Sequence, residues 1–296
     1  MVSRQGTYLG FVTGPGKEEK SWKKAEAKFL QRATLWGNQG AGLHIGIFAY
    51  NTFAVSVLTF LAQLERPPSG VRASEAKAIR NIAIGPGNWI SCEDAWFLKE
   101  GYGQTKSCTS VFHMAKAAQF RVASTEKWTS NGVGVWTRSH ALKQLLNAPD
   151  NPGAWHQWRD WYSRSHIIQL TDNLEELERE GITYQSVTKN ILGSGSNQQG
   201  DDETAIAKIK RSLQHSAYSM IKKRSQPNFE YRFRARVARW KMEGVVAHTS
   251  IRILTRLREL NRLVAPRVQS AMFSTLWNRW CIPRRFQRRH LPEIRA

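Results

Sequence analysis

Two adjacent aspartates, Asp201 and Asp202, follow a glycine and form a pattern in which paired carboxylates can bind a catalytic divalent metal. That chemistry requires a tight hairpin between apolar strands, which holds both carboxylates on the metal. Here the preceding residues, 193–200, are only Gly, Ser, Asn and Gln. Such a composition is typical of a flexible linker. We therefore interpret the two aspartates as solvated charge rather than as a metal site.

No other set of residues completes a catalytic or metal-binding constellation. Two further carboxylate pairs, Glu93 with Asp94 and Glu175 with Glu176, are consecutive on predicted helices, and consecutive helix positions do not face each other. The eight histidines show no metal-ligand spacing, and the nucleophile-elbow, P-loop and dinucleotide-binding patterns are absent from the sequence. The sequence thus predicts no catalytic residues, no metal and no cofactor, and it disfavours an independent enzyme.

Binding of a polyanion is the chemistry that the sequence favours. The chain has 296 residues and a net charge of +21, of which +18 falls in residues 208–296. A field of this size attracts nucleic acid first and an anionic membrane second. Arginine outnumbers lysine 17 to 5 in that segment, which suits bidentate contacts to phosphate. Residues 1–207, by contrast, have a net charge of only +3.

Candidate nucleic-acid contacts in this basic segment are arginines interleaved with aromatic residues, since arginine neutralises phosphates and aromatic rings stack on bases. In residues 229–237 the alternation fits a half-buried strand, but a helix would also align several arginines, so both structures remain open. A localisation signal, or a basic tail without a specific function, is the alternative. The candidates are Arg232, Arg234, Arg236, Arg239, Trp277, Arg279, Trp280, Arg284, Arg285, Phe286, Arg288 and Arg289.

A second basic surface is predicted near the N-terminus. A helix from Ser21, as its N-cap, to Trp36 would place Trp22, Phe29 and Ala33 on one apolar face. The other side of this helix presents Lys20, Lys24, Lys28 and Arg32 at four-residue spacing. This stripe is either a solvated surface or a track for a nucleic-acid backbone.

The other elements are also predicted to be helical, so the predicted fold class is mainly α. One short strand over 7–13 precedes the turn at 14–16, and a helix over 43–64 is apolar nearly all round, as expected when neighbours bury most of its sides. Further helices are predicted over 71–83, 93–99, 107–127, 137–147, 153–165, 203–224, 245–263 and 266–279. The predicted domains are a helical bundle at 1–90, a helical connection at 91–192, a flexible linker at 193–202 and an arginine-rich region at 203–296.

Composition also limits where in the cell the protein is expected. Twelve Trp and twelve Phe argue against wholesale disorder. The longest apolar stretch, 43–64, is interrupted by polar residues and is too polar to span a membrane. With no export signal at its N-terminus and only three cysteines, none of them in a paired spacing, the chain is predicted to be nuclear or cytoplasmic, neither secreted nor membrane-spanning.

The order of elements resembles the C-terminal part of a non-LTR (LINE-type) retrotransposon reverse transcriptase. In that family a strand of this kind forms the primer grip, and the helices after it form the thumb. The resemblance implies a primer-grip strand and thumb-like bundle at 1–90, with Tyr8 and Gly10 in contact with nucleic acid. The residues that resemble the family are Tyr8, Leu9, Gly10 and Phe11, then Trp22 and Trp36, and the runs 47–65, 85–89, 98–103 and 276–287.

The family's fingers and palm have no counterpart before Tyr8, and its aromatic-x-Asp-Asp catalytic box is therefore missing. The resemblance accordingly implies a catalytically incomplete fragment that binds RNA and DNA, as template-primer duplex or target, without a polymerase centre of its own. The alternative is a stand-alone structural RNA-binding protein, such as an organellar ribonucleoprotein component. No membrane partner is expected.

Overall fold

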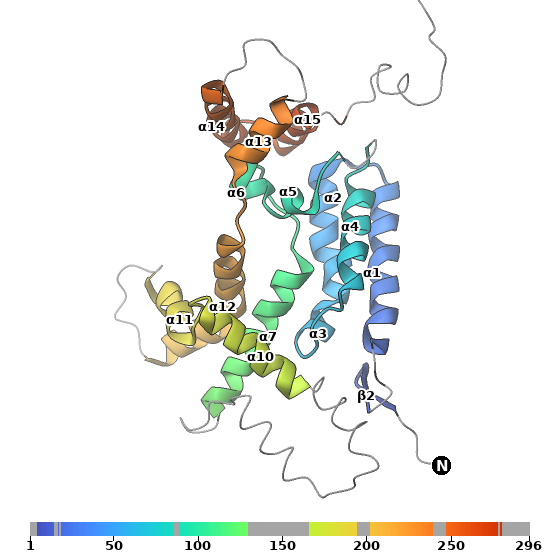
Figure 1. The fold of residues 1–296 in the computed structure, drawn as a ribbon, viewed down its shortest axis with the longest axis vertical. Helices are drawn as coiled ribbons and strands as arrows, with labels where there is room; N and C mark the ends of the chain where they lie inside the picture. Colours follow the sequence, from blue (N-terminus) through green and yellow to red (C-terminus); the bar gives the residue numbers. More distant parts are fainter. Residues whose placement is uncertain are drawn as a thin grey trace, which may run out of the picture. The chain divides into compact units, whose positions relative to one another are not determined.

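The computed structural model describes residues 5–14, 17, 19–85, 89–129, 166–193, 202–238, 247–277 and 279. Within these ranges the chain is mainly helical, with one short two-stranded sheet near the N-terminus (Figure 1). This architecture confirms the predicted fold class. None of the described helices is long and apolar enough to cross a membrane.

The N-terminal residues form a β-hairpin rather than the single strand predicted over 7–13. Strand β1 (Gly6–Tyr8) pairs antiparallel with β2 (Phe11–Thr13), and Tyr8 lies opposite Phe11. Between them, Leu9 and Gly10 both have positive φ, 48° and 87°. Two consecutive residues in that region make a tight turn whose twist matches the paired strands. Gly10 adopts this conformation without a steric penalty, so the chain reverses where the alternating pattern alone predicts that it continues.

Helix α1 (Lys20–Asn38) confirms the predicted N-terminal helix. Its buried side includes Trp22, Phe29 and Ala33, which recur at helical spacing. Ser21 is not the N-cap that the sequence predicts, because it lies inside the first turn. Instead its Oγ accepts a hydrogen bond from the Val12 amide at 2.9 Å. This bond attaches strand β2 to the start of α1.

The helix predicted over 43–64 forms, but its winding changes twice. It begins as α2 (Leu43–Ala49), widens into the π-helical turn η1 (Tyr50–Ala54), tightens into the 3-10 turn η2 (Val55–Val57) and ends as α3 (Thr59–Ala62). The expected burial on most sides is wrong for four large apolar residues. The exposed ones are Ile45, Phe48, Phe53 and Phe60.

Helix α4 (Gly70–Ile82) follows close to its predicted position. The single helix predicted over 93–99 forms instead as two short helices, α5 (Cys92–Trp96) and α6 (Leu98–Tyr102). Helices α2 and α4 approach each other closely at Gly46. A Cβ atom placed on Gly46 would lie 2.8 Å from the carbonyl oxygen of Ile82, so only glycine fits this position of the packed pair.

Helices also form most of the described chain between residues 110 and 225. These are α7 (Val111–Thr129), α10 (His166–Arg179), α11 (Tyr184–Gly193) and α12 (Asp202–Arg224). The sequence predicts α7 and α12 but neither α10 nor α11. The helices predicted at 137–147 and 153–165, and residues 194–201 of the predicted linker, lie outside the described residues.

The strand-or-helix question at 229–237 is answered by helix α13 (Phe229–Val237). The Asn228 side chain caps it, accepting a hydrogen bond from the Tyr231 amide at 2.9 Å. Two further helices follow, α14 (Ala247–Leu263) and α15 (Pro266–Leu276), close to their predicted positions.

The chain divides into two compact units whose segments alternate along the sequence. The first unit comprises residues 1–27, 56–71 and 110–225, and the second comprises 28–55, 72–109 and 226–296. In the first unit, α7, α10, α11 and α12 pack around a core that includes Phe120 and Leu177. In the second, α5, α6, α13 and α15 meet around Tyr102, Phe273 and Trp277. Helices α11 and α12, on either side of the predicted linker, pack against each other within the first unit.

Candidate nucleic-acid interface

The predicted basic stripe forms on α1, and two of its cations are fully exposed. Lys24 and Lys28 extend to solvent, whereas Lys20 donates a hydrogen bond to Gln5 Oε1 at 2.7 Å. Arg32 is half-buried because its Nη1 donates to the backbone carbonyl of Phe53 at 2.8 Å. The stripe divides between the two units at residue 27, so that Lys28 and Arg32 belong to the second unit.

Exposed aromatic rings lie beside the cations of the second unit. The Phe53 ring stacks on that of Trp36, with centroids 4.9 Å apart and planes inclined by 12°, and the Phe53 side chain remains 38% exposed. Phe48 is 46% exposed, and Lys106 Nζ lies 4.7 Å from the centroid of its ring. We call Lys28, Arg32, Phe48, Phe53 and Lys106 the basic-aromatic face.

The π-helical turn and one asparagine position this face. Asn51, in the π-helical turn, donates through Nδ2 to the Ser107 carbonyl at 2.9 Å and accepts from the Thr109 amide at 2.8 Å through Oδ1. These two bonds hold the loop that contains Lys106 against the helix that contains Phe48. Sequence analysis missed Phe48, Phe53 and Lys106 because a helix apolar all round gives no sign of which side stays uncovered. π-helical turns occur frequently at functional sites.

Buried polar groups stabilise the same helix from its other side. Glu75 is fully buried, and its Oε1 accepts hydrogen bonds from Tyr50 Oη at 3.3 Å and from Trp96 Nε1 at 3.0 Å. Burial, reinforced by the Glu75 charge, raises the pKa of Tyr50 well above its ordinary value. The same two effects raise the pKa of the Cys92 thiol to about 11. Tyr50 and Cys92 are therefore not poised for acid-base or nucleophilic chemistry near neutral pH.

The hairpin tip in the first unit is a separate exposed apolar feature. Tyr8 is 70% exposed and Leu9 is 69% exposed. The ring of Phe11 lies beneath the tip, with its centroid 5.0 Å from that of Phe60. Gly10, predicted to allow close approach of nucleic acid, is required here for its positive φ.

A buried carboxylate connects this hairpin to the rest of its unit. Glu65 Oε1 lies 2.7 Å from Lys17 Nζ and 3.0 Å from His166 Nε2, and it accepts a hydrogen bond from Ser21 Oγ at 3.1 Å. Burial raises the pKa of Glu65, but the hydrogen bonds from His166 and Lys17 outweigh burial and leave that pKa below its ordinary value. The cluster is an ionic anchor: its carboxylate is paired with Lys17 and His166, and Ser21 is only 6% exposed, so its hydroxyl is not presented to a substrate.

Two of the predicted C-terminal arginines lie around a different buried carboxylate. Arg232 Nη1 lies 3.3 Å from Asp94 Oδ1, and Arg236 Nη2 lies 3.4 Å from Asp94 Oδ2. Tyr102 Oη donates to the same carboxylate at 2.9 Å and Trp277 Nε1 at 3.2 Å. Burial and the Asp94 charge raise the pKa of Tyr102. Arg232, Arg236 and the buried Trp277 thus stabilise the core of the second unit, whereas the sequence predicts surface contacts for them.

Of the remaining predicted residues, Arg234 is exposed, Arg279 is half-buried and the others lie outside the described ranges. Arg234 lies on another side of α13 and pairs with Glu230 at 3.0 Å. Arg279 lies over the Trp89 ring, 5.5 Å from its centroid. Outside the described residues are Arg239, Trp280, Arg284, Arg285, Phe286, Arg288 and Arg289.

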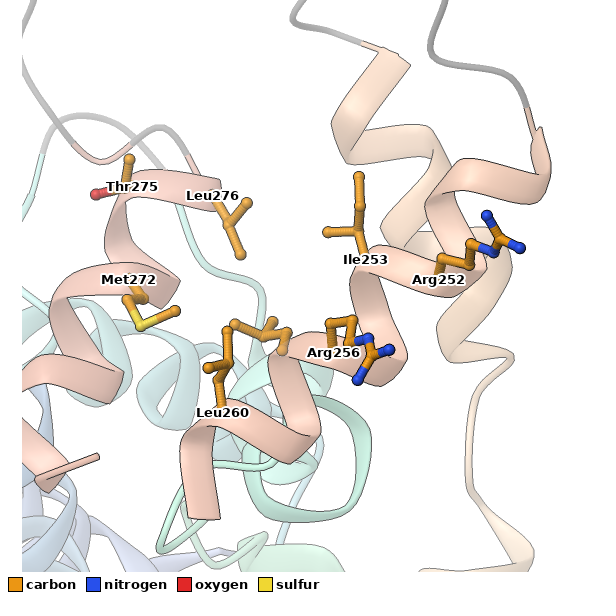
Figure 2. A pocket seen from close by; sticks show the side chains of 8 residues that line it. Arg252, Ile253, Arg256, Leu260, Met272, Thr275 and Leu276 are labelled. Atoms are coloured by element: carbon orange, nitrogen blue, oxygen red, sulfur yellow. The ribbon is translucent and has the colours of Figure 1, made fainter. Parts of the chain in front are cut away.

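An apolar groove separates α14 from α15 in the second unit. Figure 2 shows Ile253 of α14 and Met272 and Leu276 of α15 lining it, with the guanidinium groups of Arg252 and Arg256 at one end. Its volume is about 470 Å³. Aliphatic side chains dominate the lining, so the groove offers hydrophobic contact and no pair of acid and base.

Metal coordination finds no support in the described part of the chain. No group of three or more His, Cys, Asp or Glu side chains there is arranged to hold a metal ion. Asp202, the second aspartate of the pattern noted in the sequence, is the first residue of α12, and Asp201 lies outside the described ranges.

Comparison with known proteins returns no relative. No protein-family model, curated protein or solved structure matches the chain. The basic-aromatic face is accordingly interpreted from its own geometry.

Proposed function

We propose that this chain binds RNA or DNA as a catalytically incomplete part of a retrotransposon reverse transcriptase. The observation that supports binding most directly is the basic-aromatic face. There Lys106 lies against the exposed ring of Phe48, Arg32 donates to the backbone carbonyl of Phe53, and Lys28 is exposed one turn before Arg32 on α1. Cations on rigid helices neutralise phosphates, and neighbouring rings accept bases or the edges of a groove.

The charge of the surrounding segment supports the same proposal. Residues 28–55 contain no Asp or Glu, so the field over this part of the second unit is positive. The order of hairpin, basic helix and apolar helix fits the resemblance to a primer grip and thumb. In the proposed mechanism α1 follows a nucleic-acid backbone, the exposed hairpin tip contacts a strand end, and the C-terminal arginines add electrostatic affinity. The chain supplies binding and no polymerase centre.

Salt dependence tests the role of α1. Each phosphate contact that is lost should lower the slope of log affinity against log salt by about 0.7 for a single strand and 0.9 for a duplex. The double substitution Lys24→Gln with Lys28→Gln should therefore reduce the slope by about 1.4–1.8. Lys77→Gln with Lys189→Gln removes the same charge from exposed positions on α4 and α11 and serves as the matched control. Equal slopes in the two variants would contradict the proposed track.

Two further measurements separate binding from catalysis. Deletion of 281–296 removes four predicted arginines, Arg284, Arg285, Arg288 and Arg289, and should lower the salt slope further. Primer extension with Mg²⁺ and nucleotides should give no product, and templated synthesis by this chain alone would contradict the absence of a polymerase centre.

A further inference from the structure

We infer that the basic-aromatic face is a site for single-stranded nucleic acid, in which unpaired bases stack on Phe48 and Phe53. This inference rests on the proposed function and specifies its ligand. A duplex keeps its bases stacked on each other, whereas an unpaired strand can place bases on protein rings. The preference for a single strand over a duplex therefore follows from the exposed rings of the face.

Both phenylalanines are exposed in spite of a nearby apolar core. Phe48 and Phe53 occupy the same helix as the fully buried Tyr50 and Ala54. Single exposed apolar residues are common on protein surfaces. Here, however, two rings five residues apart are partly exposed, at 46% and 38%, and each has an aromatic or cationic neighbour that limits its freedom.

The two rings are already arranged for stacking. Phe53 lies nearly parallel to Trp36, which fixes the plane that a base would extend. Phe48 has the ammonium group of Lys106 at 4.7 Å from its ring centroid, a position from which the lysine can bind the phosphate of a stacked nucleotide. Asn51 holds the Lys106 loop through its two backbone hydrogen bonds, so the pair does not have to be assembled when the strand binds.

The charge of the surrounding residues favours a nucleic-acid strand as the ligand of this face. Lys28 is exposed, Arg32 is half-buried beside Phe53, and residues 28–55 contain no acid to compete with phosphate. Of the four carboxylates at 72–109 in the same unit, Glu75 and Asp94 are buried, Glu93 pairs with Arg232, and Glu100 accepts a hydrogen bond from Ser107. Exposed rings beside cations, next to a segment without acids, fit a flexible polyanion that has its own aromatic groups.

The test compares a fluorescein-labelled 20-nucleotide polyuridine with a 20-base-pair duplex by anisotropy, using the full chain. Phe48→Leu with Phe53→Leu keeps apolar volume but removes the rings. This variant should bind the single strand at least about tenfold more weakly and the duplex with less than about twofold change. Phe48→Tyr with Phe53→Tyr keeps the rings and should retain single-strand affinity. Leu192→Ala removes a comparably exposed apolar side chain from α11 in the first unit and should change neither affinity.

The outcomes separate this inference from the proposed function. If the unmodified chain binds neither ligand even at low salt, both the proposed function and the inference fail. If it binds both ligands and the leucine variant binds the single strand as well as before, nucleic-acid binding stands and the stacking site is refuted. Equal weakening for single strand and duplex, with unchanged circular dichroism, would also refute the single-strand preference.

Discussion

Replacement of Asp94 by alanine tests whether one buried carboxylate stabilises the second unit. Asp94 is only 3% exposed. It interacts with Arg232 and Arg236 from α13, with Tyr102 from α6 and with Trp277 immediately after α15. The substitution removes an acceptor that all four groups share. It leaves Arg236 and Arg232 without this counter-charge, although Arg232 also pairs with Glu93.

The expected loss is large because several interactions share this residue. Removal of one partner from a buried ion pair costs about 3–5 kcal/mol. Water offsets part of this cost, since the side chains of Arg232 and Arg236 are 29% and 18% exposed. The buried donors of Tyr102 and Trp277 also lose their acceptor, at about 1 kcal/mol each. We therefore expect Asp94→Ala to lower the free energy of unfolding by about 4 kcal/mol.

Urea denaturation followed by tryptophan fluorescence measures this change, and hydrogen exchange in α6, α13 and α15 locates it. Asp94→Asn should lose about half as much, because the amide oxygen still accepts a hydrogen bond. Glu230→Gln removes the exposed pair with Arg234 and should cost only about 0.3–0.5 kcal/mol. A loss below about 1 kcal/mol in Asp94→Ala would place it among ordinary substitutions and refute the assigned role.

Three further predictions concern the pH dependence, the packing and the reactivity of the chain. The pKa of Glu65 is lowered on folding. The ionised carboxylate therefore stabilises the fold fully at a pH above about 4.5, and this stabilisation is lost as the pH falls through the folded-state pKa. Glu65→Gln should therefore lower stability near neutral pH and reduce its decline on acidification, as measured by urea midpoints between about pH 6 and pH 3; parallel declines would argue against the anchor. Gly46→Ala should cost about 1–3 kcal/mol because its new methyl group meets a carbonyl of α4, whereas Gly70→Ala, with nothing within 4 Å, should cost nothing; similar thermal midpoints for the two variants would contradict this. With its pKa near 11, the Cys92 thiol should be alkylated at about pH 8 roughly 100-fold more slowly than a thiol of pKa 9.0, because the thiolate fraction falls tenfold per pKa unit. Mass spectrometry of the labelled peptide measures the rate, and a rate equal to that of the reference thiol would show that partial burial and the Glu75 charge do not raise this pKa.

Local sequence patterns predict much of the helical architecture. Trp22, Phe29 and Ala33 recur at the period of a helix, and α1 buries all three. The basic stripe on the same helix was also predictable, because four-residue spacing places Lys24 and Lys28 on one side. Such periodicity depends only on residues that are close in the sequence, so it can be recognised without knowledge of the fold.

Contacts between distant residues are what the sequence could not provide. Arg232 and Asp94 are 138 positions apart, and no local pattern indicates that the arginine pairs with a buried acid. The alternation at 229–237 does not distinguish a strand from a helix. The Asn228 side chain stabilises the helix by accepting a hydrogen bond from the Tyr231 amide, and this bond exists only once the first turn has formed. At the hairpin, Leu9 adopts a conformation that leucine rarely takes, so residue preferences alone favour a continuous strand. The exposure of Phe48 likewise depends on which elements cover the helix, and helical pattern does not encode that.

The alternation of segments between the two units has a consequence for synthesis of the chain. The first unit has all its segments once residue 225 has been made, whereas the second still lacks α13, α14 and α15. Asp94 therefore emerges 138 residues before Arg232. At roughly 5–20 residues per second, its first charged partner from α13 follows about 7–28 s later. During that interval α5 and α6 have no counter-charge from α13, and the second unit lacks the helices α13, α14 and α15.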